Sequence, residues 1–229
     1  MRTDPENPFF LISGITGSIG SSLASFLCSK NFNVIGLSRN KVSEDHLIKH
    51  PKVQWLEYDY AKDEPSEELI ETITKLSTKN LIGSYHCAGV YSSKKNSNLT
   101  NQDFIEVMEG NLISTINFVK LSLDILNPGG SIVILNSQAS IAAGNDELAY
   151  GVSKRAISSF VDGMQIEATK RSLQIVNVLC GAVQSEMAKG RDGFDKFIDL
   201  SDLSETLYSF ANTGKSLRIK NVEILRRNY

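Results

Sequence analysis

Short apolar runs alternate with longer amphipathic segments along almost the whole chain. Continuous apolar runs rich in β-branched residues are typical of strands that are buried on both faces of a sheet. These runs predict strands at Phe9–Ser13, Asn33–Ser38, Val53–Tyr58, Leu81–Cys87, Ser131–Asn136, Leu173–Leu179 and Ser216–Lys220. Helical spacing of apolar residues predicts helices at Ser18–Lys30, Ser43–His50, Ser66–Thr78, Thr100–Leu126, Leu148–Lys170 and Ser201–Asn212.

Strands that alternate with helices predict parallel β-α-β units. We therefore expect an α/β fold, a doubly wound, Rossmann-type domain whose seven-stranded parallel sheet is flanked by helices. No repeat, low-complexity tract or linker interrupts the pattern. We interpret residues 1–229 as a single domain with a short N-terminal segment, 1–8, and a C-terminal tail, 221–229.

Composition and charge narrow the class of protein. A chain of 229 residues with 41% hydrophobic content can bury a sizeable core. The net charge of −2 and the pI near 6.0 indicate neither a nucleic acid nor an acidic membrane as partner. Cys28, Cys87 and Cys180 lie far apart without metal-ligand spacing, so we expect reduced thiols and no metal site. The polar start MRTDPENP and the lack of a membrane-length apolar run predict a cytoplasmic protein.

Three glycines follow the first predicted strand in the stretch FLISGITGSIGSSLA. Without Cβ atoms, Gly14, Gly17 and Gly20 let the backbone approach a phosphate group, and the positive N-terminus of the next helix favours the anion. A purely structural turn is the alternative. The place of these glycines at the first strand-to-helix turn of an alternating chain favours dinucleotide binding.

The end of the second predicted strand bears on the choice of cofactor. Dinucleotide folds that bind NAD place a carboxylate about 20 residues after the glycines, on the ribose 2′-hydroxyl. Here no Asp or Glu occurs from Gly14 to Val42, and Arg39 follows the strand. A guanidinium can bind a 2′-phosphate through charge-assisted hydrogen bonds. A solvated loop arginine is the alternative, and the missing carboxylate favours NADP.

Candidate chemistry lies in the stretch ILNSQASIAAGNDELAYGVSKRA. Tyr150 and Lys154 are four residues apart and share one face of a helix, where the lysine charge favours the phenolate. Ser137 precedes Tyr150 by thirteen residues and follows a predicted strand. Its hydroxyl is therefore expected at the carboxyl end of the sheet, where ligands bind in open α/β folds.

These motifs, in this order, resemble the short-chain dehydrogenase/reductase family from about Phe9 to Lys220. The stretch from Tyr150 to Lys154 is similar to the family signature Tyr-x-x-Ser-Lys, and Ser137 stands at the position of the catalytic serine. Asn111, in EGNLIST, matches the asparagine that completes the family's tetrad. The resemblance implies that Ser137 holds the substrate carbonyl and that Tyr150 protonates the developing alkoxide. It further implies that Lys154 binds the nicotinamide ribose and lowers the pKa of Tyr150, while Asn111 positions a water.

The resemblance also implies a set of cofactor-binding residues. HCAG, at residues 86–89, is similar to the family's Asn-Asn-Ala-Gly element, and Asp59-Tyr60 stands where the family contacts the adenine. CGAVQSEM, at residues 180–187, resembles the segment that holds the nicotinamide side. The expected set is Gly14, Thr16, Gly17, Ser18, Ile19, Gly20, Arg39, Asp59, Tyr60, Cys87, Ala88, Gly89, Tyr150, Lys154, Val183 and Ser185.

Three positions depart from the family pattern. Ser18 takes the place of the middle glycine, and we expect Gly17 to supply the flexibility instead. Cys87 replaces the second asparagine of the Asn-Asn-Ala-Gly element, and Cys180 replaces a proline. None of these changes removes a group that performs the chemistry.

The segment 181–200, which covers the substrate in this family, mixes apolar residues with Lys189, Arg191 and Lys196. A short cover with basic residues favours a linear, carrier-tethered or otherwise anionic substrate. The pattern is most similar to 3-oxoacyl-[acyl-carrier-protein] reductases. The alternatives are an enzyme acting on a small free ketone or alcohol, such as a sugar, steroid or quinone, and a non-catalytic cofactor-binding protein. Lys94 and Lys95 are interpreted as solvated charges, or alternatively as contacts to an acidic carrier.

The two longest predicted helices carry more apolar residues than one buried stripe requires. A two-fold partner that presents the same helices would bury the remainder. We therefore predict a homo-oligomer, at least a dimer, through helices at about 100–126 and 148–170. The resemblance implies a homotetramer. The alternative is a monomer whose outer apolar residues stay partly exposed.

Overall fold

A seven-stranded sheet runs through the centre of the protein. The computed structural model describes residues 7–40, 47, 49–213 and 216–227. All adjacent strands pair in parallel, in the order β3-β2-β1-β4-β5-β6-β7. The predicted doubly wound parallel sheet is thereby confirmed. The strands are β1 (Phe9–Ser13), β2 (Asn33–Ser38), β3 (Val53–Glu57), β4 (Leu81–His86), β5 (Ser131–Ser137), β6 (Gln174–Cys180) and β7 (Asn221–Ile224).

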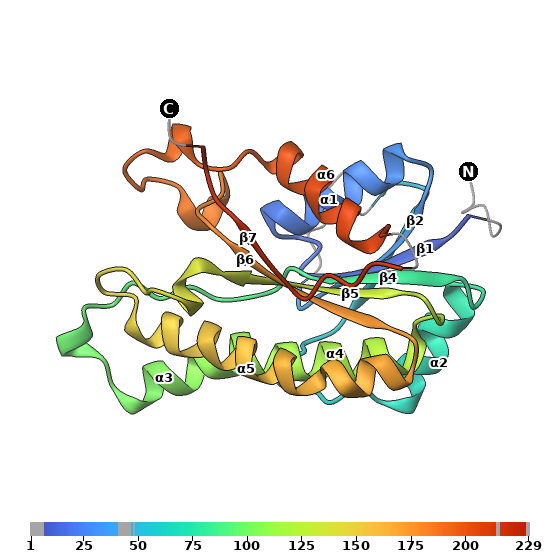
Figure 1. Ribbon diagram of the computed structural model, residues 1–229, viewed down its shortest axis with the longest axis horizontal. Helices are drawn as coiled ribbons and strands as arrows, with labels where there is room; N and C mark the ends of the chain where they lie inside the picture. The colour runs from blue at the N-terminus through green and yellow to red at the C-terminus, as the bar shows by residue number, and fades with distance from the viewer. Residues whose placement is uncertain (1–6, 41–46, 48, 214–215, 228–229) are drawn as a thin grey trace.

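Helices cover both faces of this sheet (Figure 1). On one face lie α1 and α6, and on the other lie α2, α3, α4 and α5. Among the described residues the α-helices are α1 (Ser18–Ser29), α2 (Glu67–Leu76), α3 (Asn101–Met108), α4 (Ser114–Ile125), α5 (Leu148–Lys170) and α6 (Leu200–Ala211). None of these described helices has the length and apolar character needed to cross a membrane.

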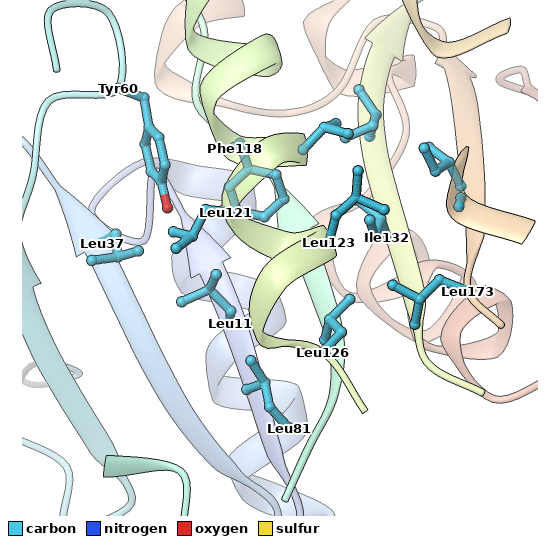
Figure 2. Close-up of a cluster of buried hydrophobic side chains, with 14 of the residues drawn as sticks. Leu11, Leu37, Tyr60, Leu81, Phe118, Leu121, Leu123, Leu126, Ile132 and Leu173 are labelled. Carbon is cyan, nitrogen blue, oxygen red and sulfur yellow. The ribbon is translucent and has the colours of Figure 1, made fainter. Parts of the chain in front are cut away.

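Each face of the sheet has its own buried apolar cluster, because alternate residues of a strand point to opposite faces. In β1, Leu11 packs under α4 and α5, whereas Ile12 packs under α1 and α6. Figure 2 shows Phe118 and Leu121 of α4 beside Leu11 and beside the ring of Tyr60. This double burial explains why β1 and β2 read as continuous apolar runs.

The predicted helix Thr100–Leu126 is interrupted. It begins as expected, with a capping box between Thr100 and Asp103 at the start of α3. A π-helical turn, η2 (Glu109–Ile113), then separates α3 from α4 and carries Asn111. Such turns insert one residue into a helix and are frequent at functional sites.

Two predicted elements need correction or fall outside the described residues. The strand predicted at Ser216–Lys220 is wrong, because β7 is formed by Asn221–Ile224, part of the segment expected as a tail. Its residues alternate between exposed and half-buried, as an edge strand does. The helix predicted at Ser43–His50 lies almost wholly outside the described residues.

Candidate active site

Two adjoining cavities lie at the carboxyl ends of the strands. Ser13 of β1 is level with Leu37 of β2 and His86 of β4, and Ser137 of β5 is level with Cys180 of β6. The first cavity, of about 320 Å³, is lined by the glycine turn and the ends of β2 and β4. The second, of about 360 Å³, is lined by the predicted catalytic residues of β5 and α5. Both share the segment 87–90, so they form two halves of one groove.

The glycine turn fits a dinucleotide phosphate. Gly14 has a φ of +69°, and a Cβ at this position would lie 2.7 Å from the backbone nitrogen of Ala88. A Cβ on Gly20 would overlap the carbonyl oxygen of Gly14. The turn can therefore pack closely against the segment after β4 and leave its backbone and the N-terminus of α1 open to an anion.

The expectation for Gly17 is wrong. Gly17 has an ordinary extended backbone, with φ −81° and ψ 161°, and caps α1 without a side chain. The residue of this turn that requires the left-handed region is Gly14. Ser18, which stands in the middle glycine's place, instead accepts a hydrogen bond at 3.0 Å from the backbone N–H of Glu186. This hydroxyl connects the glycine turn to the covering segment, a contact that the sequence did not predict.

The far end of the first cavity contains the residues predicted for the adenosine side. Arg39 is exposed and lines the cavity. Asp59 also lines the cavity, and its Oδ1 accepts the Ala61 N–H at 3.1 Å. Tyr60 also lines it, but its ring belongs to the core and packs 5.5 Å from the ring of Phe118. Burial raises the pKa of Tyr60 well above its usual value. Tyr60 therefore supports the cavity from beneath.

The second cavity brings together Ser137, Tyr150 and Lys154. Ser137 Oγ accepts the Ala139 N–H at 3.1 Å, and the Ser137 side chain is close enough to Tyr150 to influence its pKa. Lys154 is buried, and its Nζ lies 5.5 Å from the centroid of the Tyr150 ring. The three residues predicted from the motif, here called the catalytic constellation, therefore lie together in the second cavity.

Burial dominates the electrostatics of this constellation. It raises the pKa of Tyr150, and the interaction with Ser137 opposes this change only in part. Burial also lowers the pKa of Lys154 to about 8. The expectation that Lys154 holds the pKa of Tyr150 below its usual value is thus wrong for this structure, in which Tyr150 stays protonated at neutral pH.

Asn111 is fully buried beside the constellation. Its Oδ1 accepts the Val90 N–H at 2.8 Å, and its Nδ2 donates to the Val90 carbonyl and to Ser153 Oγ, both at 3.0 Å. A Cβ on Gly89 would lie 3.0 Å from Asn111 Oδ1 and 3.6 Å from Lys154 Nζ. Asn111 and Lys154 therefore flank Gly89, and the π-helical turn η2 orients this asparagine.

The remaining predicted residues also line the groove. Thr16, Ile19, Cys87, Ala88 and Ser185 line the first cavity, and Val183 lines the second. Burial raises the pKa of the Cys87 and Cys180 thiols to about 12, so neither is an activated nucleophile.

His86, at the end of the buried strand β4, is a core histidine whose ring nitrogens both have partners. Ser13 Oγ lies 2.6 Å from Nδ1 and Ser114 Oγ lies 3.3 Å from Nε2. Because Ser114 donates its own proton to the Gly110 carbonyl at 2.8 Å, we assign the ring proton to Nε2. Burial, and to a lesser extent the charge of Lys154, lowers the pKa of His86 to about 3.

Sequence reasoning missed Tyr91 and Glu147 of the second cavity, and the contacts through which they hold Arg191. The Tyr91 hydroxyl donates to Glu147 Oε1 at 2.7 Å, and Arg191 Nη2 lies 3.5 Å from the same oxygen. The Tyr91 ring packs edge-on against the Tyr150 ring, 5.1 Å between centroids. No motif links these residues, because they come from three segments that only the fold brings together.

Most of the basic residues singled out from the sequence lie elsewhere. Lys189 pairs with Glu186 at 3.3 Å, and Lys94 pairs with Asp103 at 2.7 Å. Of the three basic residues of the covering segment, Arg191 lines the second cavity.

Comparisons with known proteins agree with this geometry. A family model described as short chain dehydrogenase matches residues 9–194. Dihydropteridine reductase of Dictyostelium discoideum is 24% identical over 218 residues, which cover 90% of this chain and 88% of that protein. The NADPH-dependent 1-acyldihydroxyacetone phosphate reductase of Schizosaccharomyces pombe is 26% identical over 181 residues, 78% of this chain and 61% of that one.

A solved structure shows the same fold. An alcohol dehydrogenase from the archaeon Thermococcus sibiricus, complexed with 5-hydroxy-NADP, matches with a TM-score of 0.81 and 21% identity. The match covers 98% of this chain and 100% of that chain. Fold, assembled constellation and family match define a nicotinamide-dependent oxidoreductase. The chain belongs to the short-chain dehydrogenase family.

Proposed function

We propose that this protein is an NADPH-dependent ketoreductase and that its substrate is a 3-oxoacyl thioester of the acyl-carrier-protein type. One observation carries the proposed chemistry. The side chains of Ser137 and Tyr150 face the same 360 Å³ cavity and interact with each other, with a buried lysine beside them. A substrate carbonyl oxygen that takes a place between two such hydroxyls meets two donors at once.

The chain's own residues would polarise the carbonyl and supply the proton, and a bound nicotinamide dinucleotide would supply the hydride. Ser137 holds the carbonyl oxygen, and Tyr150, which is protonated at neutral pH, donates its proton to the developing alkoxide. A charged Lys154 favours the phenolate that remains. Lys154 would also bind the nicotinamide ribose, and Asn111 would position a water that leads to Lys154. General acid catalysis of this kind contributes roughly 10²–10⁴-fold in rate.

NADP is the cofactor that the adenosine end of the groove favours. Arg39 is exposed at the end of β2, and no carboxylate occurs between Gly14 and Val42 to hold a ribose 2′-hydroxyl. The fission yeast relative is named as NADPH-dependent, and the archaeal neighbour was solved with 5-hydroxy-NADP. Both support the same choice.

The proposed substrate class rests on the covering segment. It is short, it places Arg191 against the second cavity, and this cavity is otherwise lined largely by apolar and small residues. An extended acyl chain with a polar thioester suits such a cavity better than a bulky ring system does.

A substrate panel tests this proposal. Purified protein is assayed for NADPH oxidation with 3-oxoacyl thioesters, small ketones, quinones and a quinonoid dihydropteridine. We expect the highest kcat/KM with a 3-oxoacyl thioester and a lower value with NADH. A higher kcat/KM with a free ketone would overturn the substrate class. No oxidation with any compound would replace the ketoreductase by a cofactor-binding protein.

We also propose that two copies associate through the face formed by α3, η2, α4 and α5. The α-helices lie together on one side of the sheet. Ile105 of α3, Ile113 of η2, and Leu148, Val152 and Ile166 of α5 are 38–71% exposed. A two-fold partner would cover them. Light scattering at micromolar concentration should give at least a dimer, and a monomer would refute the proposal.

A further inference from the structure

The guanidinium of Arg191 is held against the second cavity by two aromatic rings and a carboxylate. Its Cζ lies 5.6 Å from the centroid of the Tyr91 ring and 5.9 Å from that of the Phe197 ring. Its Nη2 is 3.5 Å from Glu147 Oε1. Stacking uses the faces of a guanidinium and leaves its in-plane N–H groups available. Within the described part of the chain, the Glu147 carboxylate at 3.5 Å is the one polar partner of these N–H groups.

Glu147 keeps this arrangement in place. Its side chain is only 13% exposed, and its two oxygens accept the Tyr91 hydroxyl at 2.7 Å and the Gly144 N–H at 2.9 Å. Glu147 is therefore oriented without help from Arg191. Its charge attracts the guanidinium, while the long 3.5 Å separation leaves the donors of Arg191 free to turn to a ligand.

Arg191 is also close to the reacting atoms. The Tyr91 ring contacts both the Arg191 guanidinium and the Tyr150 ring, so one aromatic ring separates the cation from the proposed proton donor. The charge of Arg191 is among the influences that lower the pKa of Tyr150 against the larger effect of burial. A substrate oxygen a few bonds beyond the reduced carbonyl would lie within reach of this guanidinium.

We propose that Arg191 is a specificity-determining residue that donates hydrogen bonds to a second oxygen of the substrate, near the carbonyl that is reduced. This inference rests on the proposed ketoreductase function and names the recognised chemistry. A 3-oxoacyl thioester offers a carbonyl oxygen at the required position, and a free 3-oxo acid offers a carboxylate. A simple ketone offers neither.

The test compares three substrates: the N-acetylcysteamine thioester of 3-oxobutanoate, free 3-oxobutanoate, and pentan-2-one, which lacks the second oxygen. The thioester carries no phosphate, so the arginine cannot act on a distant charge. Arg191→Met keeps an unbranched apolar stem and removes the donors. Lys189→Met is the matched control, because Lys189 belongs to the same segment, pairs with Glu186 and lies outside the lining of the cavity.

A hydrogen bond to a charged group contributes about 1.5–3 kcal/mol, which corresponds to roughly 10–150-fold. We expect Arg191→Met to lower kcat/KM by this factor for the substrates with a second oxygen, and by less than about 3-fold for pentan-2-one. Lys189→Met should leave all three values near those of the wild type. A larger loss with the thioester than with the acid identifies the thioester as the ligand, and the reverse identifies the carboxylate.

An equal loss on all three substrates would show that Arg191 only supports the covering segment and would overturn the inference, as would no loss on any. Reduction of pentan-2-one alone by the wild type would also overturn it, while the ketoreductase function would stand. If no compound is reduced, the proposed function fails. In that case the role of Arg191 is tested by calorimetric titration of 3-hydroxybutanoate in the presence of NADP. The inference requires the Kd of 3-hydroxybutanoate to be higher for Arg191→Met than for Lys189→Met.

Discussion

Replacing His86 by asparagine should remove most of the acid sensitivity of the fold. His86 lies at the end of β4 and connects β1 to the helix after η2 through Ser13 and Ser114. Its ring is 1% exposed and packs 4.8 Å from the Phe118 ring. Protonation would therefore place a charge in the core without solvent and beside the buried cation of Lys154.

The size of the effect follows from the pKa of this histidine. Burial lowers it from 6.5 to about 3, so the unfolded chain takes up a proton more readily than the folded protein. The stability from this difference is complete above pH 6.5 and is lost as the pH falls toward 3. At about 1.36 kcal/mol per pH unit, the free energy of unfolding should fall by about 3 kcal/mol by about pH 4.5.

Urea unfolding followed by the fluorescence of Trp55, the one tryptophan, measures this dependence. Wild type and His86→Asn are compared between about pH 7 and pH 4.5. The variant loses hydrogen bonds and should be less stable at pH 7, but its stability should decline less toward acid. His50→Asn, at a partly exposed histidine outside the core, is the control and should keep the wild-type dependence. Parallel declines in wild type and His86→Asn would refute the reasoning.

Three further substitutions test the nucleotide-binding half of the groove. Arg39→Ala should raise the Kd of NADPH by roughly 10–150-fold and leave that of NADH nearly unchanged; equal weakening would make Arg39 a loop residue. Ser18→Gly removes the 3.0 Å bond to Glu186 and should increase proteolysis of the covering segment, with no increase counting against this contact. Gly14→Ala should abolish NADPH binding, because its Cβ would meet Ala88, whereas Gly129→Ala, also at positive φ but in open space, should bind normally.

The parts of the fold that the sequence predicted are those with a strong local signal. β1 and β2 match their predicted bounds because both are buried on both faces and contain no polar interruption. The position of β7 was predicted wrongly because its four residues alternate between exposed and half-buried positions, a pattern that a short irregular segment also shows. The π-helical turn η2 was not predictable, since its apolar spacing differs little from that of an α-helix.

The residues of the candidate site also differ in how far the sequence could predict them. Ser137, Tyr150 and Lys154 were predictable because they fall within one strand-loop-helix unit with fixed spacing. Tyr91 and Glu147 were not predictable, and neither were the contacts of Arg191 with them, because these contacts join segments up to a hundred residues apart in the sequence. The pKa of Tyr150 was predicted in the wrong direction, because spacing along a helix reveals a nearby charge but not the depth of burial.

The role of Tyr150 as proton donor is tested most directly by NADPH oxidation with the best carbonyl substrate in Tyr150→Phe. The substitution keeps the ring packed against Tyr91 and removes the hydroxyl that faces the second cavity beside Ser137. We predict that kcat falls by at least about 10²-fold, while the Kd of NADPH, measured by its fluorescence, changes less than about 3-fold. A kcat near that of the wild type would contradict the account, because another group would then supply the proton.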